Sequence, residues 1–352
     1  MQKELTKEAL ELLKDLIAIE SFSSEENETA ARLEQWFMDH GIPFFRENNN
    51  VYAFNHFYDK KKPNLLLNSH HDTVKPNGAY TKNPFDPHIE DGKLYGLGSN
   101  DAGGALVSLL ALFTFYYNHP NPKYNLIITA TAEEESSGPL GLNSLLKTLP
   151  PIDVAIVGEP TLMQLAIAEK GLVVFDGLIE GTASHAAHPN EENPIMKLPK
   201  VLNWFKEFSF KKESEVLGPV KMTVTQVNAG KQHNVVPSGV NLVIDVRVND
   251  RYSNAEIIEL LQKEAPCKLT PRSTDLNSSS IPLTHKLVTA GIELGRKPYG
   301  SPTLSDQAKL SCPSLKLGPG DSTRSHTANE FIHVHEIEEG IALYIKLLNE
   351  IL

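Results

Sequence analysis

Histidine and carboxylate side chains stand at two junctions in the first third of the chain. His70 and Asp72 follow the apolar run Leu65–Leu67, which is typical of a buried strand. Residues two apart on a strand point to the same side, so one of the pair can bind a metal while the other orients it. Asp101 stands further along in a glycine-rich turn before an apolar helix, where glycine lets the backbone approach a ligand closely. We interpret His70 and Asp101 as two ligands of one metal site.

Each of these residues also has an ordinary structural explanation. A histidine at a strand end is more often a polar surface or core residue, and an aspartate before a helix is most often an N-cap. The turn Gly96–Gly98 lacks the third glycine and the later acid of a dinucleotide-binding loop. The metal-site hypothesis therefore depends on what the following segments contribute.

Further acids and one more histidine follow later strands. They are the run Glu133–Glu135 after strand 124–132, Glu159 after strand 154–157, and His326 after the loop 318–320. Three adjacent acids also suit a solvated helix start, but at a strand end they repel one another unless cations neutralise them. Mixed imidazole and carboxylate ligands suit zinc, cobalt or manganese better than calcium or magnesium.

The order of predicted elements indicates how these residues are positioned. Alternating strands and helices up to residue 165 predict an α/β fold with a mainly parallel sheet and helices on both faces, whose sites form beyond the carboxyl ends of the strands. From 168 the order becomes strand-helix-strand-strand-helix-strand, which is typical of a ferredoxin-like α+β domain. We expect a catalytic domain of residues 1–167 and 277–352 and an inserted lid or dimerisation domain of residues 168–276. Near the N-terminus, a helix after Ser23 is expected to use Glu26 in a capping box.

The composition limits the class of function. The chain has 352 residues, of which 40% are hydrophobic and 22% charged, and its length suggests two domains. A net charge of −11 argues against nucleic acid and against anionic membrane surfaces as partners. The two distant cysteines predict no disulfide, and the acidic amphipathic N-terminus resembles no signal peptide. No apolar run approaches the ~20 residues that span a bilayer, so a cytoplasmic protein is expected.

Five short motifs together resemble the dinuclear zinc amidohydrolases of the carboxypeptidase G2, aminoacylase and acetylornithine deacetylase kind. The motifs are Ser69–Asp72, Gly96–Asp101, Ala132–Glu135, Val157–Thr161, and Gly318–Gly320 with His326. The resemblance covers almost the whole chain, and five motifs in this order are a specific signal. It implies a zinc-peptidase-like catalytic domain for the larger of the two predicted domains.

The resemblance also implies a role for each polar residue of the motifs. His70 and Glu159 would bind one zinc, Glu135 and His326 would bind the other, and Asp101 would bridge the pair. Such metals lie roughly 3.5–4 Å apart and lower the pKa of a water between them. Zinc is the expected metal, with cobalt as the second choice.

Two more acids would complete the catalytic group. Asp72 would support His70, and Glu134 would be the general base that takes a proton from the water and delivers it to the leaving amine. Two departures from the family pattern bear on these assignments. Glu133 replaces the usual aspartate, with one extra residue before Gly138, so the frame could slip to make Glu133 the base and Glu134 a ligand. Gly103 stands where the family often has a lysine.

The inserted segment contains expected substrate contacts. His185 resembles the family histidine that reaches the active site of a partner subunit, where it would donate to the developing oxyanion. Asn234 and Arg247 resemble the lid segment that holds a substrate carboxylate, although Arg247 could equally pair with Asp245. Arg324, which lies near His326 in the sequence, is a further candidate for substrate contact.

The resemblance implies metal-dependent hydrolysis of the amide bond of an N-acyl amino acid. N-acetylornithine or a close relative such as N-acetylcitrulline, from arginine biosynthesis, is the first expectation. The alternatives are a succinyl-diaminopimelate desuccinylase, a dinuclear metallo-dipeptidase or aminopeptidase, and a binding protein of the same fold without metals. The expected partners are a small-molecule substrate and a second copy of the chain, joined through the inserted domain as a homodimer.

Overall fold

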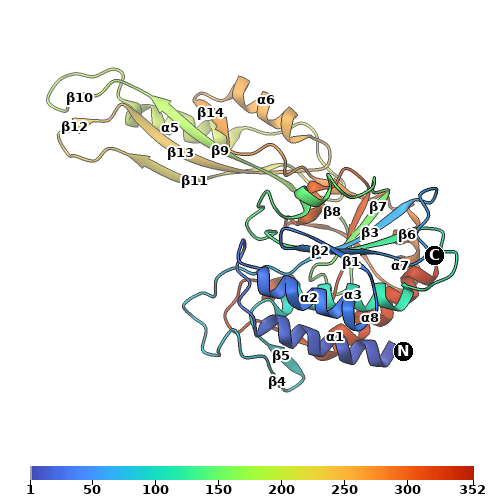
Figure 1. Cartoon of the computed structure of the whole chain (residues 1–352). Helices are drawn as coiled ribbons and strands as arrows, with labels where there is room; N and C mark the ends of the chain where they lie inside the picture. Colours follow the sequence, from blue (N-terminus) through green and yellow to red (C-terminus); the bar gives the residue numbers. More distant parts are fainter. Residues whose placement is uncertain (1) are drawn as a thin grey trace. The chain divides into compact units, whose positions relative to one another are not determined.

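The computed structural model describes residues 2–352, which divide into two compact units (Figure 1). The first unit comprises residues 2–167, Ser280–Tyr299 and Ser305–Leu352. The second unit comprises Ala168–Ser279 and Gly300–Leu304. Among the residues described, no helix has both the length and the hydrophobicity needed to cross a membrane.

The first unit is built on a mixed sheet with helices on both faces. The strands are, in spatial order, β1 (Phe44–Glu47), β2 (Asn50–Phe54), β6 (Asn125–Thr131), β3 (Asn64–His70), β7 (Val154–Val157), β17 (Ser314–Lys316), β8 (Leu165–Glu169) and the short β15 (Ser279–Ser280). The short β16 (Pro298–Ser301) also pairs with β8, outside this order. The helices are α1 (Gln2–Ile17), α2 (Asn27–Asp39), α3 (Gly104–Tyr116), α4 (Leu142–Leu145), α7 (Lys286–Glu293) and α8 (Val334–Asn349). The central pairs β6–β3, β3–β7 and β7–β17 are parallel, whereas β1–β2, β2–β6 and β17–β8 are antiparallel. The expected α/β class is confirmed.

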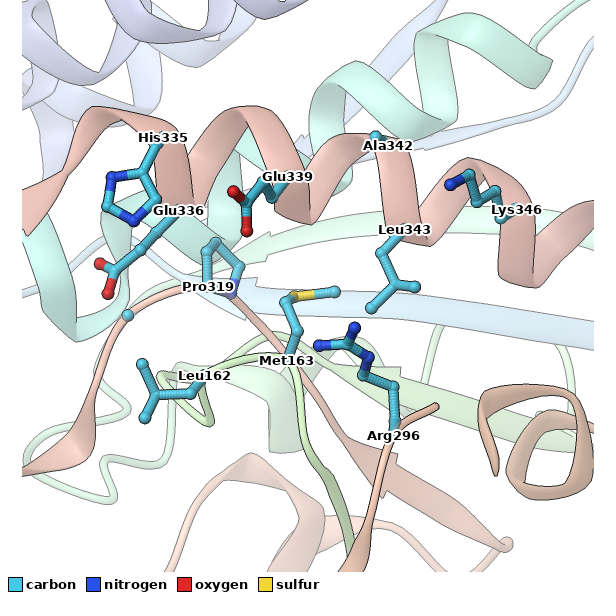
Figure 2. A pocket seen from close by; sticks show the side chains of 11 residues that line it. Leu162, Met163, Arg296, Pro319, His335, Glu336, Glu339, Ala342, Leu343 and Lys346 are labelled. Carbon is cyan, nitrogen blue, oxygen red and sulfur yellow. The ribbon is translucent and has the colours of Figure 1, made fainter. Parts of the chain in front are cut away.

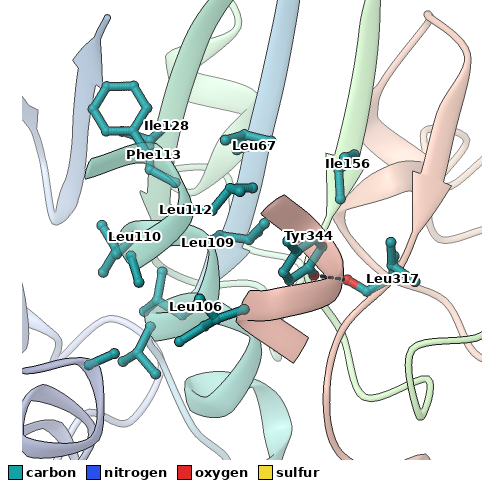
Figure 3. Close-up of a cluster of buried hydrophobic side chains, with 14 of the residues drawn as sticks. Leu67, Leu106, Leu109, Leu110, Leu112, Phe113, Ile128, Ile156, Leu317 and Tyr344 are labelled. Carbon is teal, nitrogen blue, oxygen red and sulfur yellow. Dashed lines mark hydrogen bonds between the residues drawn. The ribbon is translucent and has the colours of Figure 1, made fainter. Parts of the chain in front are cut away.

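The core explains why β3 is a continuous apolar run. Successive side chains of a strand point to opposite faces, and both faces of this sheet are covered. Leu65 and Leu67 belong to the large cluster formed with α1, α2, α3 and α8, whereas Leu66 packs on the other face with α4. Figure 3 shows residues of α3 around Leu67 and Ile128, with the Tyr344 hydroxyl of α8 donating to the carbonyl of Leu317. Helix α3 is apolar on every side because it contacts β3, α1 and α8 at once.

The parallel register brings the functional segments to one edge of the sheet. His70 pairs with Thr131 across β3 and β6, and Asn68 pairs with Val157 across β3 and β7. The carboxyl ends of these three strands therefore lie side by side, and the segments that follow them emerge at the same edge. A separate sheet of β4 (His88–Glu90), β5 (Lys93–Tyr95) and β18 (Phe331–His333) joins the C-terminal segment to the chain just before the turn that contains Asp101.

Helix α2 begins later than the capping-box prediction placed it. Its first residue is Asn27, and the side chain of Glu26 forms no cap hydrogen bond. The buried Glu26 carboxylate accepts instead from the backbone N–H of Ser24 and of Glu133 and from the side chain of Asn49. The prediction was wrong because this acid joins its own loop to two distant segments, so it is not available to cap the helix.

The second unit is a four-stranded antiparallel sheet in the order β11-β13-β9-β14. Its elements are β9 (Gly171–Glu180), β10 (Ser184–His185), α5 (Pro194–Glu207), β11 (Lys221–Ala229), β12 (Val235–Val236), β13 (Gly239–Val248), α6 (Asn254–Glu264) and β14 (Lys268–Pro271). Alternate residues of β9 and β13 pack with Val201 and Phe205 of α5 and Ile257 and Leu261 of α6. Without the short β10–β12 pair, the order of elements is the split βαβ arrangement. The expected second α+β domain is therefore present.

Candidate metal centre

His70 ends β3 and is 1% exposed. Its Nδ1 lies 3.0 Å from the backbone oxygen of Asp72 and 3.3 Å from the Asp72 carboxylate. Its Nε2 points to the other side, 3.5 Å from Asp101 Oδ1 and 3.7 Å from Glu159 Oε1. This Nε2 is buried and has no hydrogen-bond partner among residues 2–352. An unpartnered buried ring nitrogen that faces two carboxylates is the arrangement of a metal ligand.

A second group of donors lies on the other side of Asp101. His326 Nε2 is 3.0 Å from Glu135 Oε2 and 3.6 Å from Asp101 Oδ2. Two triads of possible ligand atoms result, and within each triad the three atoms lie within 4.8 Å of one another. The first triad is His70, Asp101 and Glu159, and the second is Asp101, Glu135 and His326. The two triads therefore share Asp101, with a different oxygen of its carboxylate facing each histidine.

Asp72 fixes the loop that carries the acidic run. Its carboxylate accepts from the backbone N–H of Glu134 at 3.0 Å, from that of Glu135 at 3.1 Å, and from the hydroxyl of Ser23 at 2.6 Å. The same carboxylate holds His70 on its other side. A single buried acid thus orients residues from two strand ends, which is the usual task of a group behind a metal ligand.

The three glutamates after β6 point to different places. Glu135 meets His326, whereas the Glu133 carboxylate accepts from the Ser24 hydroxyl at 2.8 Å and from the Leu140 N–H at 2.9 Å. The carboxylate of Glu134 accepts no hydrogen bond from any residue in the described range 2–352. Glu133 is turned away in the left-handed region, with φ of 56°. This geometry favours Glu135 as the ligand and Glu134 as the base over the frame shifted by one.

Burial and crowding raise the pKa values of the acids in this cluster. Burial, followed by the charge of Asp101, raises the pKa of Glu159 to about 8. Burial, with the charges of Glu159, Asp306 and Glu135, raises the pKa of Glu134 well above 4.5. Burial alone would lower the pKa of His70, but the carboxylates of Asp101 and Asp72 raise it above 6.5. Acids at this density are stable as anions only beside added positive charge.

These observations fit a pair of divalent cations. The donor set consists of two imidazoles and carboxylates arranged in two triads, with one carboxylate facing both. Such mixed nitrogen and oxygen ligands suit the transition metals better than calcium or magnesium. The residues that could hold the cations are His70, Asp101, Glu159, Glu135 and His326.

Two buried acids near the site were not singled out by the sequence. Glu330 is 2% exposed, and its carboxylate accepts from the backbone N–H groups of Gly98, Asn100 and Asp101. Asp306 is 5% exposed and accepts from the side chains of Asn68 and Thr131 beneath the strand ends. The only sequence signal for Glu330 is an acid placed directly before the apolar residues Phe331 and Ile332.

Arg324 is already engaged within the first unit. Its Nη2 lies 2.7 Å from Glu336 Oε1, its Nη1 donates to the backbone oxygen of Phe331, and its guanidinium stacks over the Phe331 ring. The side chains of Arg324 and Glu336 are 13% and 14% exposed. The structure therefore places Arg324 in a partly buried ion pair with Glu336, so its guanidinium is not free for a substrate.

The remaining sequence candidates lie in the second unit. His185 belongs to the small β10–β12 pair, where its Nδ1 accepts from the Ala187 N–H. Asn234 is exposed beside β12, and its backbone oxygen accepts from Ala186. Arg247 forms a bidentate ion pair with Asp245, in which Nε lies 2.9 Å from Oδ1 and Nη2 lies 3.1 Å from Oδ2. This pairing is the structural alternative that the sequence left open. These residues form no part of either triad.

Comparison with known proteins identifies the family. The profile of the peptidase family M20/M25/M40 matches residues 66–350. A succinyl-diaminopimelate desuccinylase of Rickettsia bellii is 25% identical over 97% of this chain and 96% of its own length. A protein of the same name from Rickettsia canadensis is 30% identical over 71% of each chain.

Solved structures show the same fold. An M20 family metallo-carboxypeptidase of Sulfolobus solfataricus superposes with a TM-score of 0.73 at 18% identity, over 97% of this chain and 99% of the other. A dinuclear metal-binding M20 peptidase of Bacillus subtilis, the YXEP protein, gives 0.74 at 14% identity over 98% of both chains. The family expected from the five motifs is confirmed, whereas the narrower likeness to acetylornithine deacetylases is not supported by these relatives. This chain belongs to the peptidase family M20/M25/M40, a family of hydrolases that act on amide bonds.

Proposed function

We propose that this enzyme hydrolyses the amide bond of an N-succinyl amino acid, with N-succinyl-diaminopimelate as the first candidate substrate. The carrying observation is the pair of triads that share Asp101, with the unpaired carboxylate of Glu134 beside them. The choice of acyl group is supported by the relatives that match almost the full chain, which are named succinyl-diaminopimelate desuccinylases. N-acetylornithine, the first expectation from the sequence, therefore moves to second place.

The proposed ligands divide the centre into two halves. His70 and Glu159 would hold one cation, Glu135 and His326 would hold the other, and Asp101 lies between the two groups with one carboxylate oxygen toward each histidine. When bound, the cations supply positive charge that polarises the scissile carbonyl and lowers the pKa of a water molecule. Asp72 keeps the His70 ring in place and holds the backbone of the Glu134–Glu135 loop.

Glu134 is the proposed general base and acid. Its carboxylate is free of hydrogen bonds from residues 2–352, and its pKa is raised by burial and by neighbouring acids. A carboxylate with a raised pKa can take a proton at near-neutral pH and return it, which is what amide cleavage requires at the leaving nitrogen. The products of this step are a short dicarboxylic acid and a free amine.

A substrate panel tests the acyl group and the amine. Metal-loaded enzyme is assayed for released amine with succinyl-diaminopimelate, succinylornithine, acetylornithine, acetylcitrulline and acetyllysine, and with dipeptides that have a free N-terminus. We expect kcat/KM to be highest for succinyl-diaminopimelate and at least tenfold lower for the acetyl compounds, because a site built for a carboxylate rejects a substrate without it. A preference for free dipeptides would overturn the proposal in favour of a peptidase.

Substrate contacts from the second unit are a separate part of the proposal. We assign the oxyanion donor to His185 and carboxylate binding to Asn234. Arg247 is the second candidate for carboxylate binding, and it would have to exchange its ion pair with Asp245 for the substrate. The test replaces each by alanine and compares kcat with KM. Loss of an oxyanion donor lowers kcat by about 10²–10³-fold, whereas loss of a carboxylate contact raises KM. Unchanged kinetics in all three variants would remove the second unit from the catalytic scheme.

The edge of the second sheet supports the proposed homodimer. Strand β11 is the outermost strand in the order β11-β13-β9-β14, is nine residues long, and has five exposed residues in succession from Thr225 to Ala229. A long exposed edge strand can pair with a second chain. We expect a dimer in sedimentation at micromolar concentration and a monomer after Thr225→Pro, because proline removes a donor from the edge. A monomeric parent protein would contradict this assignment.

A further inference from the structure

A pocket lies in the first unit between α8 and the loop that follows Glu159 (Figure 2). Its volume is about 370 Å³, which is within the range of small-molecule sites. Met163 and Pro319 line one wall, and Glu339, Leu343 and Lys346 of α8 line another. None of the proposed metal ligands lines this pocket.

Charged side chains of both signs face this pocket without partners. The side chain of Arg296 forms no hydrogen bond or ion pair with any of residues 2–352, and its Nε is buried. Glu339 and Lys346 are likewise free of ion pairs within the described chain. Glu336 also lines the pocket, but its carboxylate is already paired with Arg324 at 2.7 Å. The charges that the pocket can offer to a ligand are therefore those of Arg296, Glu339 and Lys346.

The positions of Arg296 and Glu339 are complementary across the pocket. Figure 2 shows the guanidinium of Arg296 and the carboxylate of Glu339 directed into the same space beside Met163, from opposite walls. The two groups do not pair with each other. A buried guanidinium atom without an acceptor is costly, so a ligand that supplies a carboxylate on this side and a cation on the other satisfies both walls.

The wall between the two charges is apolar and fixed by an unusual backbone. Leu162 and Met163 both lie in the left-handed region, with φ of 53° and 55°, which is uncommon for residues other than glycine. Their N–H groups donate to the backbone oxygens of Gly320 at 2.7 Å and Gly318 at 2.9 Å. This conformation leaves Leu162 47% exposed at the pocket rim. Strained backbone of this kind is concentrated at ligand sites.

We propose that this pocket is a second binding site, separate from the metal centre, for a small α-amino acid. The carboxylate of the ligand pairs with Arg296, its ammonium group pairs with Glu339, and its aliphatic portion packs on Met163 and Leu343. The assignment rests on the charges and shape of the pocket and is independent of the acyl group that the enzyme removes.

Calorimetry of the metal-loaded enzyme tests the site. The probes are L-leucine, L-lysine and L-glutamate, together with 4-methylpentanoate and isopentylamine, which are leucine without its amine and without its carboxylate. We expect at least one of the three amino acids to bind. Both truncated analogues should bind at least tenfold more weakly than leucine, because 4-methylpentanoate cannot pair with Glu339 and isopentylamine cannot pair with Arg296.

Variants distinguish this pocket from the metal centre. Arg296→Gln and Glu339→Gln should each weaken amino-acid binding at least tenfold while kcat/KM for amide hydrolysis stays within twofold of the parent. Arg251→Gln, an exposed arginine of the second unit, is the matched control and should leave binding unchanged. Glu339 is exposed, so its variant tests the site even if Arg296→Gln fails to fold. No binding by any amino acid at 20 mM, or binding to both pocket variants that is as tight as binding to the parent, would overturn the proposal.

Discussion

Glu330 accepts a hydrogen bond from the backbone N–H of Asp101 at 2.9 Å, although 229 residues separate the two in the sequence. The same carboxylate accepts from Asn100 at 2.8 Å and from Gly98 at 3.2 Å, so it holds the whole turn that presents the shared acid. Pairing of β18 with β5 brings Glu330 to this place, because β18 starts at the next residue. Burial, with the charge of Asp101, raises the pKa of Glu330 to about 8.

Glu330 is therefore expected to position Asp101 for metal binding. Glu330→Gln replaces one of its oxygens by an amide nitrogen that cannot accept from a backbone N–H. Loss of such supporting groups typically weakens metal binding by about 10- to 100-fold. Competition with a chromophoric chelator measures this change. The matched control is Glu338→Gln on the exposed face of α8, which should leave metal affinity unchanged. Equal metal affinity in Glu330→Gln and Glu338→Gln would show that the turn keeps its conformation without Glu330.

The assignment of Glu134 as the base predicts a separation of turnover from metal binding. Glu134→Gln should lower kcat by about 10²–10⁴-fold while both cations remain bound, because only proton transfer is lost. Glu133→Gln should instead lower stability by roughly 1–3 kcal/mol through its lost contacts with Ser24 and Leu140, with kcat within tenfold of the parent. Metal analysis and single-turnover rates measure both variants. A reversed pattern would mean that the acid frame is shifted by one residue.

The sequence predicted the parts of the site that depend on local order. Strands ending in His70, before Glu133 and before Glu159 are recognisable from short apolar runs, and a parallel sheet brings such ends together. Contacts between residues far apart in the chain leave no local signal. The contacts of Glu330 with the Asp101 turn and of Glu26 with the backbone of Glu133 are both of this kind. Glu26 misled the helix prediction because its spacing from Ser23 matched a capping box that the fold does not use.

The sequence motifs did not predict the substrate, for a different reason. The motifs around the metal centre serve every amide that the family cleaves, whereas a few pocket contacts separate acetyl from succinyl substrates. Those contacts are not encoded in the spacing of ligands such as His70 and Asp101. Relatives that match along the full chain carried this information, and they favour the succinyl alternative.

Gly320 is expected to be essential for the shape of the metal centre. It has φ of +95°, and a Cβ added there would lie 2.6 Å from Asn100 Oδ1 and 3.1 Å from Pro160 Cβ. Asn100 precedes Asp101, and its Oδ1 accepts from the Asp321 N–H at 3.0 Å. Gly320→Ala should therefore displace the ligand turn and lower kcat/KM by about 10- to 100-fold, as small misplacements of reacting groups do.

Gly295 provides the matched control for Gly320. It also has a positive φ, of +81°, but a Cβ added there meets nothing within 4 Å. Gly295→Ala should carry the same backbone cost, on the order of 1 kcal/mol, and leave kcat/KM within twofold of the parent. Thermal unfolding and steady-state kinetics measured on both variants separate backbone strain from displacement of the site. Equal losses of activity would attribute the effect to strain alone.

The two cysteines are expected to react slowly and in a pH-dependent way. Cys267 and Cys312 are free and half-buried, and burial raises the pKa of each thiol from 9.0 to about 11. The charged thiolate is the form disfavoured by burial, and it is the form that reacts, so alkylation by iodoacetamide at pH 8 should be about 100-fold slower than in the urea-unfolded chain. The rate of alkylation should rise about tenfold per pH unit up to about pH 11.

The same pKa shift predicts a loss of stability at high pH. The thiols of the unfolded chain lose their protons at lower pH than those of the folded chain, so the free energy of unfolding should fall as the pH rises from about 9 to about 11. Mass spectrometry of Cys267→Ser and Cys312→Ser assigns the rate to each thiol, and a rate equal to that of the unfolded chain would show that the thiols are not protected by burial.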